Sequence, residues 1–509
     1  MIIRYSDILK NQPIYNFGVI GHVAHGKSTL VRSITGTKTQ KHSSEKVRNI
    51  TINIGYANSK IYVDNSGKFI TCPSNCDFDD DNTLKIVSHI SFVDCPGHEA
   101  YMSNMISGSA VMNSCVLVIA SNEQIPQPQT YEHFQAVKDL DIDNLLILQN
   151  KCDLIGMSEN DMVLDNINSF VSGTSISNSP IIPSSIQNDV NRQEIVYNLV
   201  KNSTVDNFLN LKNKINKPLS MTIIRSFDVN KQNCSYHNLK GGVVGGSLIT
   251  GFLKINDVIE IRPGFITGGK FRPIYAKVLS LQSDNRKLEY AVPGGLIGVG
   301  LDIDPSFSKD NGMLGQTLGS LGSLPDVCKE IAVEYSFMER LNKLDDLKFK
   351  TDESILININ SMNIEAKITK CSKKKKYLLI NLNKPVCINI GQRVAIFKMI
   401  SGRWLLVSNG IFQEGIPLKI DDTHIKMEDE NLDRKIEIEN DIDDINFKGP
   451  ENYENLLNNV EFKKGQGKKT YIPPPTVRKI NKDSVFTNYN EILDFLNRNS
   501  ESIKYDDLL

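Results

Sequence analysis

A glycine-rich loop between an apolar run and a helix-like run constrains this chain more than any other feature. Residues 21–29 (GHVAHGKST) fit the pattern G-x-x-x-x-G-K-[ST], after the apolar residues 16–20 and before the helix-like residues 28–35. Glycines let backbone N–H groups approach phosphates, and the N-terminus of a helix adds a favourable field. The sequence therefore predicts an α/β sheet that binds a nucleotide. The predicted phosphate contacts are Ala24, His25, Gly26, Lys27, Ser28 and Thr29.

A second motif, D-C-P-G, supplies the predicted metal and γ-phosphate contacts. It follows the apolar residues 89–93 and contains Asp94 and Gly97. We expect Asp94 to hold Mg²⁺ through water and the Gly97 amide to contact the γ-phosphate. Lys27 is expected to offer a charge to the β/γ oxygens, and Ser28 a hydroxyl to Mg²⁺.

A third motif, N-K-C-D, follows the apolar residues 144–149 and predicts the base. An aspartate at position 153 can accept two hydrogen bonds from guanine N1 and the 2-amino group, which adenine does not offer. The three motifs in this order predict GTP. A loop after residues 180–183 is expected to complete the pocket. The predicted base contacts are Asn150, Lys151, Asp153, Ser185, Ile186 and Gln187.

Two residues are candidates for the hydrolysis step. His98, directly after D-C-P-G, is expected to position the attacking water, since a neutral imidazole can hold a water by a hydrogen bond. Thr51, in R-N-I-T-I, lies where a mobile switch segment would cover the nucleotide and join Mg²⁺ when the γ-phosphate is present. On local sequence alone, a solvent-facing loop histidine and an ordinary strand threonine are the alternatives.

Composition limits the class of protein. The chain has 509 residues, 40% hydrophobic and 23% charged, with a formal net charge of −1, so we expect a globular protein of two to four domains. The nine cysteines form no disulfide framework and indicate reduced thiols in the cytoplasm. No apolar run is long enough to cross a bilayer, and we expect no membrane partner.

Changes in hydrophobic pattern and composition divide the chain into five parts. Residues 1–210 alternate strand-like and helix-like runs, which predicts the GTP-binding α/β domain. Short apolar runs separated by turn residues predict β-barrels at 211–325 and 326–420. Residues 421–447 are rich in acids and predict a flexible linker. Residues 448–509 contain a helix-like run at 453–460 and a basic, proline-containing stretch.

Several segments resemble the gamma subunit of eukaryotic translation initiation factor two, a translational GTPase. They are NFGVIGHVAHGKST (16–29), RNITINIGYANSKIY (48–62), PLSMTIIRSFDVN (218–230), LKGGVVGGS (239–247), YAVPGGLIGVG (290–300) and NKPVC (383–387). The resemblance spans residues 5–420. It implies a heterotrimer with alpha and beta subunits that carries methionyl initiator tRNA, in the GTP state, to the small ribosomal subunit. Activating and nucleotide-exchange factors are implied as well.

Carried over by position, the resemblance adds three residues to the predicted site. Val23 and Ile50 match the apolar pair that flanks the catalytic histidine, here His98. Tyr56 matches a tyrosine near the tRNA acceptor end, where stacking on a base is worth about 1–3 kcal/mol. An ordinary strand tyrosine is the alternative for Tyr56.

Three departures from the family pattern matter. Ile186 stands where the family has alanine, and we expect a reshaped base pocket. Cys72 and Cys76 remain from a cysteine cluster that binds zinc in archaeal relatives; two thiolates half-fill a tetrahedral site, so we expect no zinc. The chain also continues past the second barrel. Its 453–460 helix and following segments resemble part of the beta subunit, and we expect that helix to dock on the GTPase domain of the same chain.

Two other functions fit some of these features. Another aminoacyl-tRNA-delivering GTPase, such as an elongation factor, would share the nucleotide motifs, but the RSFDVN and LKGGVVGG segments argue against it. A GTP-binding assembly scaffold without useful turnover is the second. Intact His98, Thr51 and Ser28 argue against lost hydrolysis.

Overall fold

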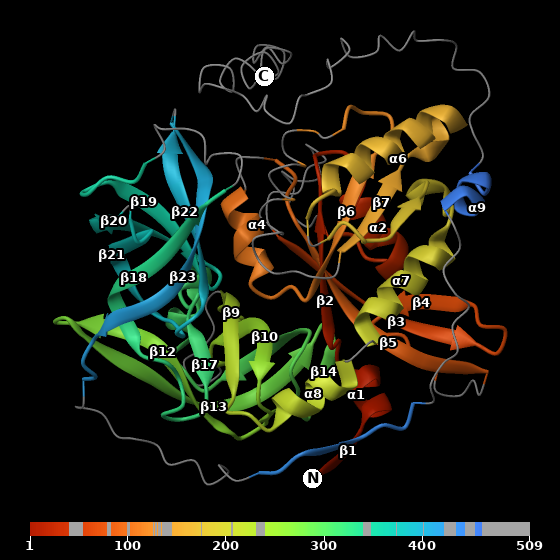
Figure 1. Cartoon of the computed structure of the whole chain (residues 1–509). Coiled ribbons are helices and arrows are strands. Elements are labelled where there is room, and N and C mark those ends of the chain that lie inside the picture. The colour runs from red at the N-terminus through yellow and green to blue at the C-terminus, as the bar shows by residue number, and fades with distance from the viewer. Residues whose placement is uncertain are drawn as a thin grey trace.

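The architecture is an α/β domain beside two β-barrels, seen in a computed structural model (Figure 1). The structure describes residues 1–39, 54–78, 83–98, 102–125, 127, 130, 134, 145–174, 176–204, 207–230, 240–338, 348–372, 374–400, 402–421, 434–442 and 453–460. The predicted helix at 129–140, the basic stretch at 463–469 and the last predicted helix at 490–497 lie largely or wholly outside these residues.

The α/β domain is built on a sheet of seven strands in the order β4-β3-β5-β2-β6-β7-β8. From β2 to β8 the neighbouring strands are parallel, and β3 and β4 extend the sheet antiparallel beyond β5. Strands β2, β6 and β7 are buried along their whole length, which explains their continuous apolar runs. The strands are β2 Tyr15–Ile20, β3 Gly55–Asp64, β4 Phe69–Pro73, β5 Leu84–Asp94, β6 Ser114–Ala120, β7 Leu145–Asn150 and β8 Ile181–Pro183.

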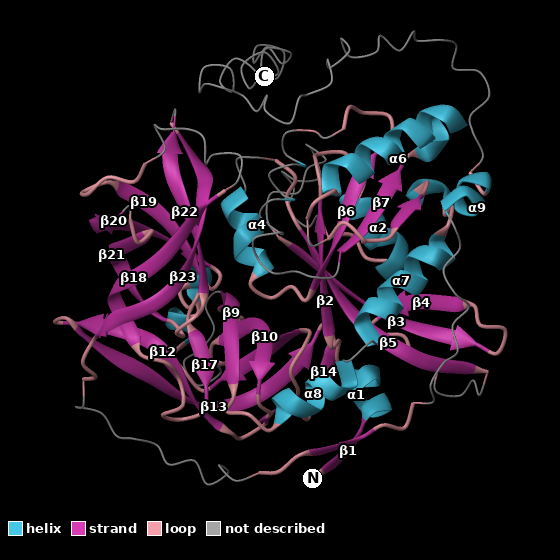
Figure 2. Cartoon of the chain, viewed as in Figure 1, coloured by secondary structure: helices cyan, strands magenta, loops and turns pink. Residues whose placement is uncertain are grey.

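Helices cover both faces of this sheet (Figure 2). On one face, α2 and α7 bury apolar side chains against β2, β5 and β7, and on the other α4 and α6 do the same. Helix α2 begins after Gly26 and ends at Gly36, whose left-handed conformation (φ 71°) lets its N–H bond the Arg32 carbonyl. The helices are α1 Tyr5–Asn11, α2 Lys27–Thr35, α4 Met102–Ser109, α6 Met157–Val171, α7 Arg192–Thr204 and α8 Asn207–Ile215, with 3-10 helices η2 Cys152–Leu154 and η3 Ile186–Asn188.

The first barrel closes through the pairing of β12 with β13. Around the ring the order is β12-β17-β9-β10-β16-β13, and β14 adds to the edge of β13. Helix α8 crosses the predicted boundary at residue 210, and the first barrel strand begins at Ser220. The strands are β9 Ser220–Phe227, β10 Val243–Thr250, β12 Val258–Thr267, β13 Lys270–Ser283, β14 Arg286–Leu288, β16 Leu296–Leu301 and β17 Thr317–Gly319; β11 Leu253–Lys254 pairs with β15 Tyr290–Ala291, and the 3-10 helices are η5 Pro305–Phe307 and η6 Lys309–Asn311.

The second barrel is closed in the order β18-β21-β20-β19-β22-β23. Its interior is lined by alternate apolar side chains of every strand, which is the period-two pattern of its sequence. The strands are β18 Val327–Phe337, β19 Ser354–Ile359, β20 Met362–Ser372, β21 Tyr377–Cys387, β22 Arg393–Ile400 and β23 Arg403–Pro417. The predicted class, a GTPase domain followed by two barrels, is confirmed.

The three domains contact one another directly. Asn358 of β19 donates to Ser107 of α4 at 2.9 Å, and Ser361 donates to the Ile223 carbonyl of β9 at 2.8 Å. Gln12 exchanges two hydrogen bonds with the backbone of Val292, at 2.8 and 3.0 Å. These contacts place both barrels against the α/β domain.

The prediction of a flexible linker at 421–447 is wrong for residues 434–442. Strand β24 (Glu437–Glu439) pairs in parallel with β1 (Ile2–Arg4), along the lower edge of the molecule in Figure 1. Ile436 and Ile438 are 5% and 2% exposed. The count of acids described only the outward face of this strand, because isoleucine and glutamate alternate along it.

Side-chain contacts hold the same segment at both ends. Arg434 forms an ion pair with Asp257 of the first barrel at 2.7 Å, and Asn216 exchanges hydrogen bonds with the backbone of Ile436. Asp441 accepts a hydrogen bond from the Ser6 backbone at 2.9 Å. The segment therefore joins the first barrel to the N-terminal strand and helix α1.

Candidate functional site

The predicted phosphate loop lies between β2 and α2, at the carboxyl edge of the sheet. Ala24 and Gly26 adopt left-handed conformations (φ 62° and 107°), and Gly26 is the N-cap of α2. A Cβ on Gly26 would come within 2.4 Å of the Asn150 side-chain nitrogen, so the position requires glycine. Lys27, Ser28 and Thr29 form the first turn of the helix. This arrangement favours an anion at the helix N-terminus.

Lys27 is held inside this loop. Its side chain is buried, and its Nζ donates to the carbonyls of Gly21 at 2.9 Å and His22 at 2.6 Å. Burial lowers the pKa of Lys27 from 10.5 to about 8, although the nearby Asp94 carboxylate opposes this shift. An anionic ligand beside the ammonium would raise the pKa again.

The D-C-P-G turn closes over the loop. A Cβ on Gly97 would come within 2.4 Å of Lys27 Nζ and 2.9 Å of the Val23 nitrogen. Val23 is half-buried, and His98 is exposed at the rim of the turn. His98 is nevertheless close enough for its charge to lower the pKa of His22. Ile50 and Thr51 lie outside the described residues, so of the predicted set around His98 the structure places only Val23 and His98 itself.

His22 offers a polar atom that fits a nucleotide. Its Nδ1 is buried and has no hydrogen-bond partner among the described residues. Burial, and after it the charge of the neighbouring His25, lower the pKa of His22 to about 4. Buried polar atoms usually have a hydrogen-bond partner. A polar ligand bound in the phosphate loop could be the partner of the neutral His22 ring.

His25 anchors the loop to the sheet. Its Nδ1 lies 3.1 Å from the Val118 carbonyl of β6, and its Nε2 lies 3.1 Å from a Glu123 carboxylate oxygen. The hydrogen bond from His25 holds the pKa of Glu123 below its usual value. Sequence analysis missed Glu123. Its position just after β6 was the available signal, because the carboxyl ends of parallel strands share one edge.

Asp94 lies at the carboxyl end of β5 and is fully buried. Its Oδ2 accepts a hydrogen bond from Thr39 Oγ1 at 2.5 Å. Gly55 permits this contact, since a Cβ there would come within 2.6 Å of the Thr39 Cβ. Sequence analysis missed Thr39, because no motif marks it.

Asn150 joins the phosphate loop to the predicted base pocket. Its Nδ2 donates to the His25 carbonyl at 2.8 Å, and its Oδ1 accepts from the Ile186 backbone at 3.1 Å. Lys151 follows in a left-handed conformation (φ 62°). The Asn150 side chain thus connects the N-K-C-D motif to the phosphate loop and to the loop at Ile186.

The predicted base contacts gather around Asp153 and Ser185. Both are buried, and Asn188 Nδ2 lies 3.4 Å from Asp153 Oδ2 and 2.9 Å from Ser185 Oγ. Asn188 was not predicted. The larger Ile186 side chain packs into the domain core, while Gln187 is exposed. The extra volume of Ile186 therefore extends the core.

Tyr56 lies under an arginine of the first barrel. The Arg225 guanidinium carbon is 5.0 Å from the centre of the Tyr56 ring, a cation–π distance, and Arg225 also donates to the Ile54 carbonyl. Burial raises the pKa of the Tyr56 hydroxyl. The ring face predicted to stack on tRNA therefore holds Arg225 in this arrangement.

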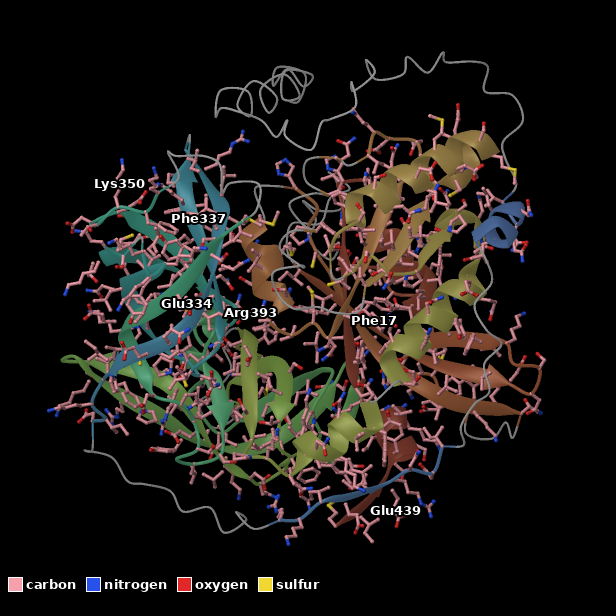
Figure 3. All side chains as sticks on the ribbon, in the orientation of Figure 1. Phe17, Glu334, Phe337, Lys350, Arg393 and Glu439 are labelled. Atoms are coloured by element: carbon pink, nitrogen blue, oxygen red, sulfur yellow. The ribbon has the colours of Figure 1, made fainter. Side chains whose placement is uncertain are left out.

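Helix α9 (Tyr453–Asn458) docks on the GTPase domain, beside the base pocket. Leu456 and Leu457 are 4% and 1% exposed. Leu457 and Val460 form a buried cluster with Cys152 of the N-K-C-D motif. Asn191 donates to the Leu456 carbonyl at 2.7 Å. The helix lies near α7 in Figure 1, and Figure 3 shows Phe17 of β2 inside the same domain.

The sequence of the chain is similar to those of known proteins. The family model "Elongation factor Tu GTP binding domain" matches residues 12–205, and "Initiation factor eIF2 gamma, C terminal" matches residues 329–412. The chain is 38% identical over 434 residues to eukaryotic translation initiation factor 2 subunit 3 of Drosophila melanogaster, covering 79% of this chain and 89% of that protein. It is 39% identical to the gamma subunits of Encephalitozoon cuniculi (80% and 94% covered) and Schizosaccharomyces pombe (82% and 97% covered).

The chain belongs to the initiation factor 2 gamma family. It is a GTP-binding initiation factor and a translational GTPase. This supports initiation over the two alternatives, an elongation factor and an inactive scaffold.

Solved structures show the same fold as this gamma-family chain. The selenocysteine-specific elongation factor EF-Sec, from a bacterium, superposes with a TM-score of 0.58 at 22% identity, covering 78% of this chain and 58% of that one. The elongation factor SelB of Methanococcus maripaludis, with the GTP analogue GppNHp, gives 0.59 at 19% identity and covers 80% of each chain. In the part of the chain that the structure describes, no helix is long and apolar enough to span a membrane.

Proposed function

We propose that this chain is the GTP-binding subunit of a heterotrimeric initiation factor, which carries methionyl initiator tRNA to the small ribosomal subunit and releases it after GTP hydrolysis. The observation that carries the proposal is the 38–39% identity to initiation factor 2 gamma subunits over nearly their whole length. Asn150 of the N-K-C-D motif supports it, since its side chain bonds both the phosphate loop at His25 and the loop at Ile186. The proposed place of action is the cytoplasm.

We propose a role for the main residues of the nucleotide site. Lys27 would donate from its ammonium to the β/γ oxygens of the nucleotide. Those oxygens would take the place of the Gly21 and His22 carbonyls, to which the ammonium now donates. Asp153 and the Ser185–Gln187 segment would recognise guanine. Ser28, Asp94 and Thr51 would hold Mg²⁺, directly or through water, and Mg²⁺ supplies charge neutralisation between the phosphates. Thr39, which now bonds Asp94, would orient that carboxylate.

His98 would position the attacking water, with Val23 and Ile50 as its apolar flank. The exposed position of His98 at the rim of the Gly97 turn supports this role. Because the ring is not packed in the core, it can rotate toward a nucleotide without disturbing the core. We expect slow intrinsic hydrolysis, since no motif in the sequence marks an arginine finger in cis. An activating protein would supply the missing electrostatics, and a separate factor would exchange GDP for GTP.

Tyr56 is the proposed contact for the acceptor end of the tRNA. Arg225 has to leave the ring face before a base can stack there. Stacking at Tyr56 therefore requires the Arg225 side chain of the first barrel to move. This connects tRNA binding to a contact between two domains.

The proposed protein partners are the alpha and beta subunits. Helix α9 already covers one surface of the GTPase domain with Leu456, Leu457 and Val460. We assign residues 448–509 to a beta-like fragment that is fused to the chain and acts in cis. A tether of this kind raises the local concentration of the helix to about the millimolar range.

Discrimination between two methionyl-tRNAs tests the proposal. The full chain, with its alpha and beta partners and a non-hydrolysable GTP analogue, is titrated against methionylated initiator tRNA and methionylated elongator tRNA. We expect initiator tRNA to bind at least about tenfold more tightly, which is about 1.4 kcal/mol. Equal affinities would favour a general aminoacyl-tRNA carrier, and no binding of either would favour a scaffold; both contradict the proposal.

A further inference from the structure

Strand β3 places a fully buried lysine between a cysteine and a histidine. Lys60 pairs in register with Cys72 of β4 and with His89 of β5. Directly paired residues of neighbouring strands point to the same face of a sheet, so the three side chains lie together. The Lys60 side chain is 0% exposed. A lysine is almost never buried to this extent unless it is paired.

The ammonium is held by the turn that follows β4. Lys60 Nζ donates to the Cys76 carbonyl at 3.1 Å and forms an ion pair with Asp77 Oδ1. The same turn is closed by the Cys76 N–H, which donates to the Pro73 carbonyl at 3.0 Å. The turn that carries Cys76 is thus folded around a positive charge.

Asp77 also contacts the first barrel. Its second oxygen, Oδ2, forms an ion pair with Arg286 of β14. Arg286 also donates to the Asn11 side chain at 3.3 Å. Burial raises the pKa of Asp77, but the hydrogen bonds from Lys60 and Arg286 outweigh it and keep the pKa below its usual value. One carboxylate therefore joins the buried lysine to a second domain.

The residues around this turn do not fit zinc, which the family resemblance implies for a full cysteine cluster. Both ring nitrogens of His89 are engaged, Nδ1 with the Leu9 carbonyl at 2.8 Å and Nε2 with Ser74 Oγ at 3.1 Å. Cys72 and Cys76 would fill only two of the four positions of a tetrahedral zinc site. Over the described ranges, no three His, Cys, Asp or Glu side chains are grouped to hold a metal.

We propose that the Lys60 ammonium is the structural cation of this turn, in the place of a metal, and that Asp77 uses it to hold the first barrel against the GTPase domain through Arg286. A buried charge is stable only if it is paired, so Lys60 and Asp77 depend on each other. The contact with Arg286 makes the turn part of the interface between the two domains.

Metal analysis tests the first half of this inference. The full chain is purified without chelator, its zinc content is measured by mass spectrometry, and its melting temperature is recorded with and without EDTA. We expect far less than one zinc per chain and the same melting temperature in both buffers. One zinc per chain, with a lower melting temperature in EDTA, would overturn the inference.

A pair of substitutions tests the second half. Asp77→Asn leaves the buried ammonium without its carboxylate, and we expect the melting temperature to fall by several degrees. Adding Lys60→Met removes the stranded charge, so the double variant should be more stable than Asp77→Asn alone. Lys68→Met, an exposed lysine in the turn between β3 and β4, is the matched control and should leave the melting temperature unchanged.

The opposite order of stability would contradict the pairing. If the double variant is no more stable than Asp77→Asn, or cannot be obtained folded, Lys60 is not the partner that Asp77 neutralises. Hydrogen exchange adds a readout of the interface. Asp77→Asn should speed amide exchange in β14, which carries Arg286, and Lys68→Met should not.

Discussion

Leu457 of helix α9 packs on Cys152, the residue that stands between Lys151 and Asp153 in the guanine motif. The Leu456 carbonyl accepts a hydrogen bond from Asn191, three residues after Asn188. Helix α9 therefore touches both loops of the base pocket. A helix this short is marginal by itself in water, so its docking and the order of those loops should stabilise each other.

Undocking the helix should weaken nucleotide binding. In the variant Leu456→Asp/Leu457→Asp we expect GDP to dissociate about fivefold faster or more, the lower end of typical coupling between sites. Stopped-flow release of a fluorescent GDP measures it. The matched control Asn455→Asp/Asn458→Asp adds the same charge to the exposed face of α9. Equal release rates for the leucine variant and the parent chain would show that the helix is not coupled to the pocket.

Asp153→Asn should change the base that the site prefers. An amide no longer accepts two hydrogen bonds from guanine, and the loss should be about 1–3 kcal/mol. The amide can donate to the 2-oxo group of xanthine, so binding of xanthosine triphosphate should improve. Competition of the two nucleotides against labelled GDP measures both effects. Asp161→Asn, an exposed position on α6, is the control. Unchanged GTP affinity in Asp153→Asn would remove Asp153 from the base pocket.

His98→Ala should separate hydrolysis from binding. If the ring positions water in the transition state only, single-turnover hydrolysis should fall about a hundredfold while GTP affinity stays within about twofold. Both quantities are measured with the activating factor present. Hydrolysis at the parent rate would exclude His98 from the reaction. A loss of GTP affinity as large as the loss in rate would show a ground-state contact instead.

Nucleotide affinity should fall with rising pH. Burial lowers the pKa of Lys27 to about 8 in the nucleotide-free site, and a bound phosphate raises it. Below about pH 8 the ammonium is already charged, whereas above it each bound nucleotide must take up a proton, which weakens binding by up to about tenfold per pH unit. Calorimetry of GDP binding between about pH 7 and about pH 9 measures this, since that window spans the shifted pKa.

The variant Lys27→Arg is the control for that titration. Its guanidinium stays charged throughout, so its affinity, although lower overall, should not vary over the same range. The same pH dependence in both proteins would assign the effect to another group.

Local patterns in the sequence predicted the strand–loop–helix unit around residues 21–29 and both barrels. The strand–loop–helix context located residues 21–29, and β-strand periodicity located both barrels, because these features depend on neighbours along the chain. Apolar spacing at 453–460 likewise predicted the face of α9 that is now buried. The resemblance, and not the spacing, indicated where this helix would dock.

Contacts between distant segments could not be predicted in this way. The pairing of β1 with β24 joins residues more than 430 positions apart, and the acids of β24 concealed its alternation. Thr39 and Asn188 act through side-chain hydrogen bonds to predicted site residues, and no motif marks them. Glu123 contacts His25, and its position just after β6 was its only signal. No sequence pattern singled out Lys60, because its place between Cys72 and His89 follows only from the strand register.

The most direct test of the account compares the two nucleotide states of one complex. The affinity of the factor for methionyl initiator tRNA is measured with a non-hydrolysable GTP analogue and with GDP, at the same salt concentration. The account predicts at least about tenfold tighter binding in the GTP state, which is a coupling of about 1.4 kcal/mol. Equal affinity in the two states would contradict it, because a chain that does not distinguish GTP from GDP cannot deliver and release tRNA as a switch.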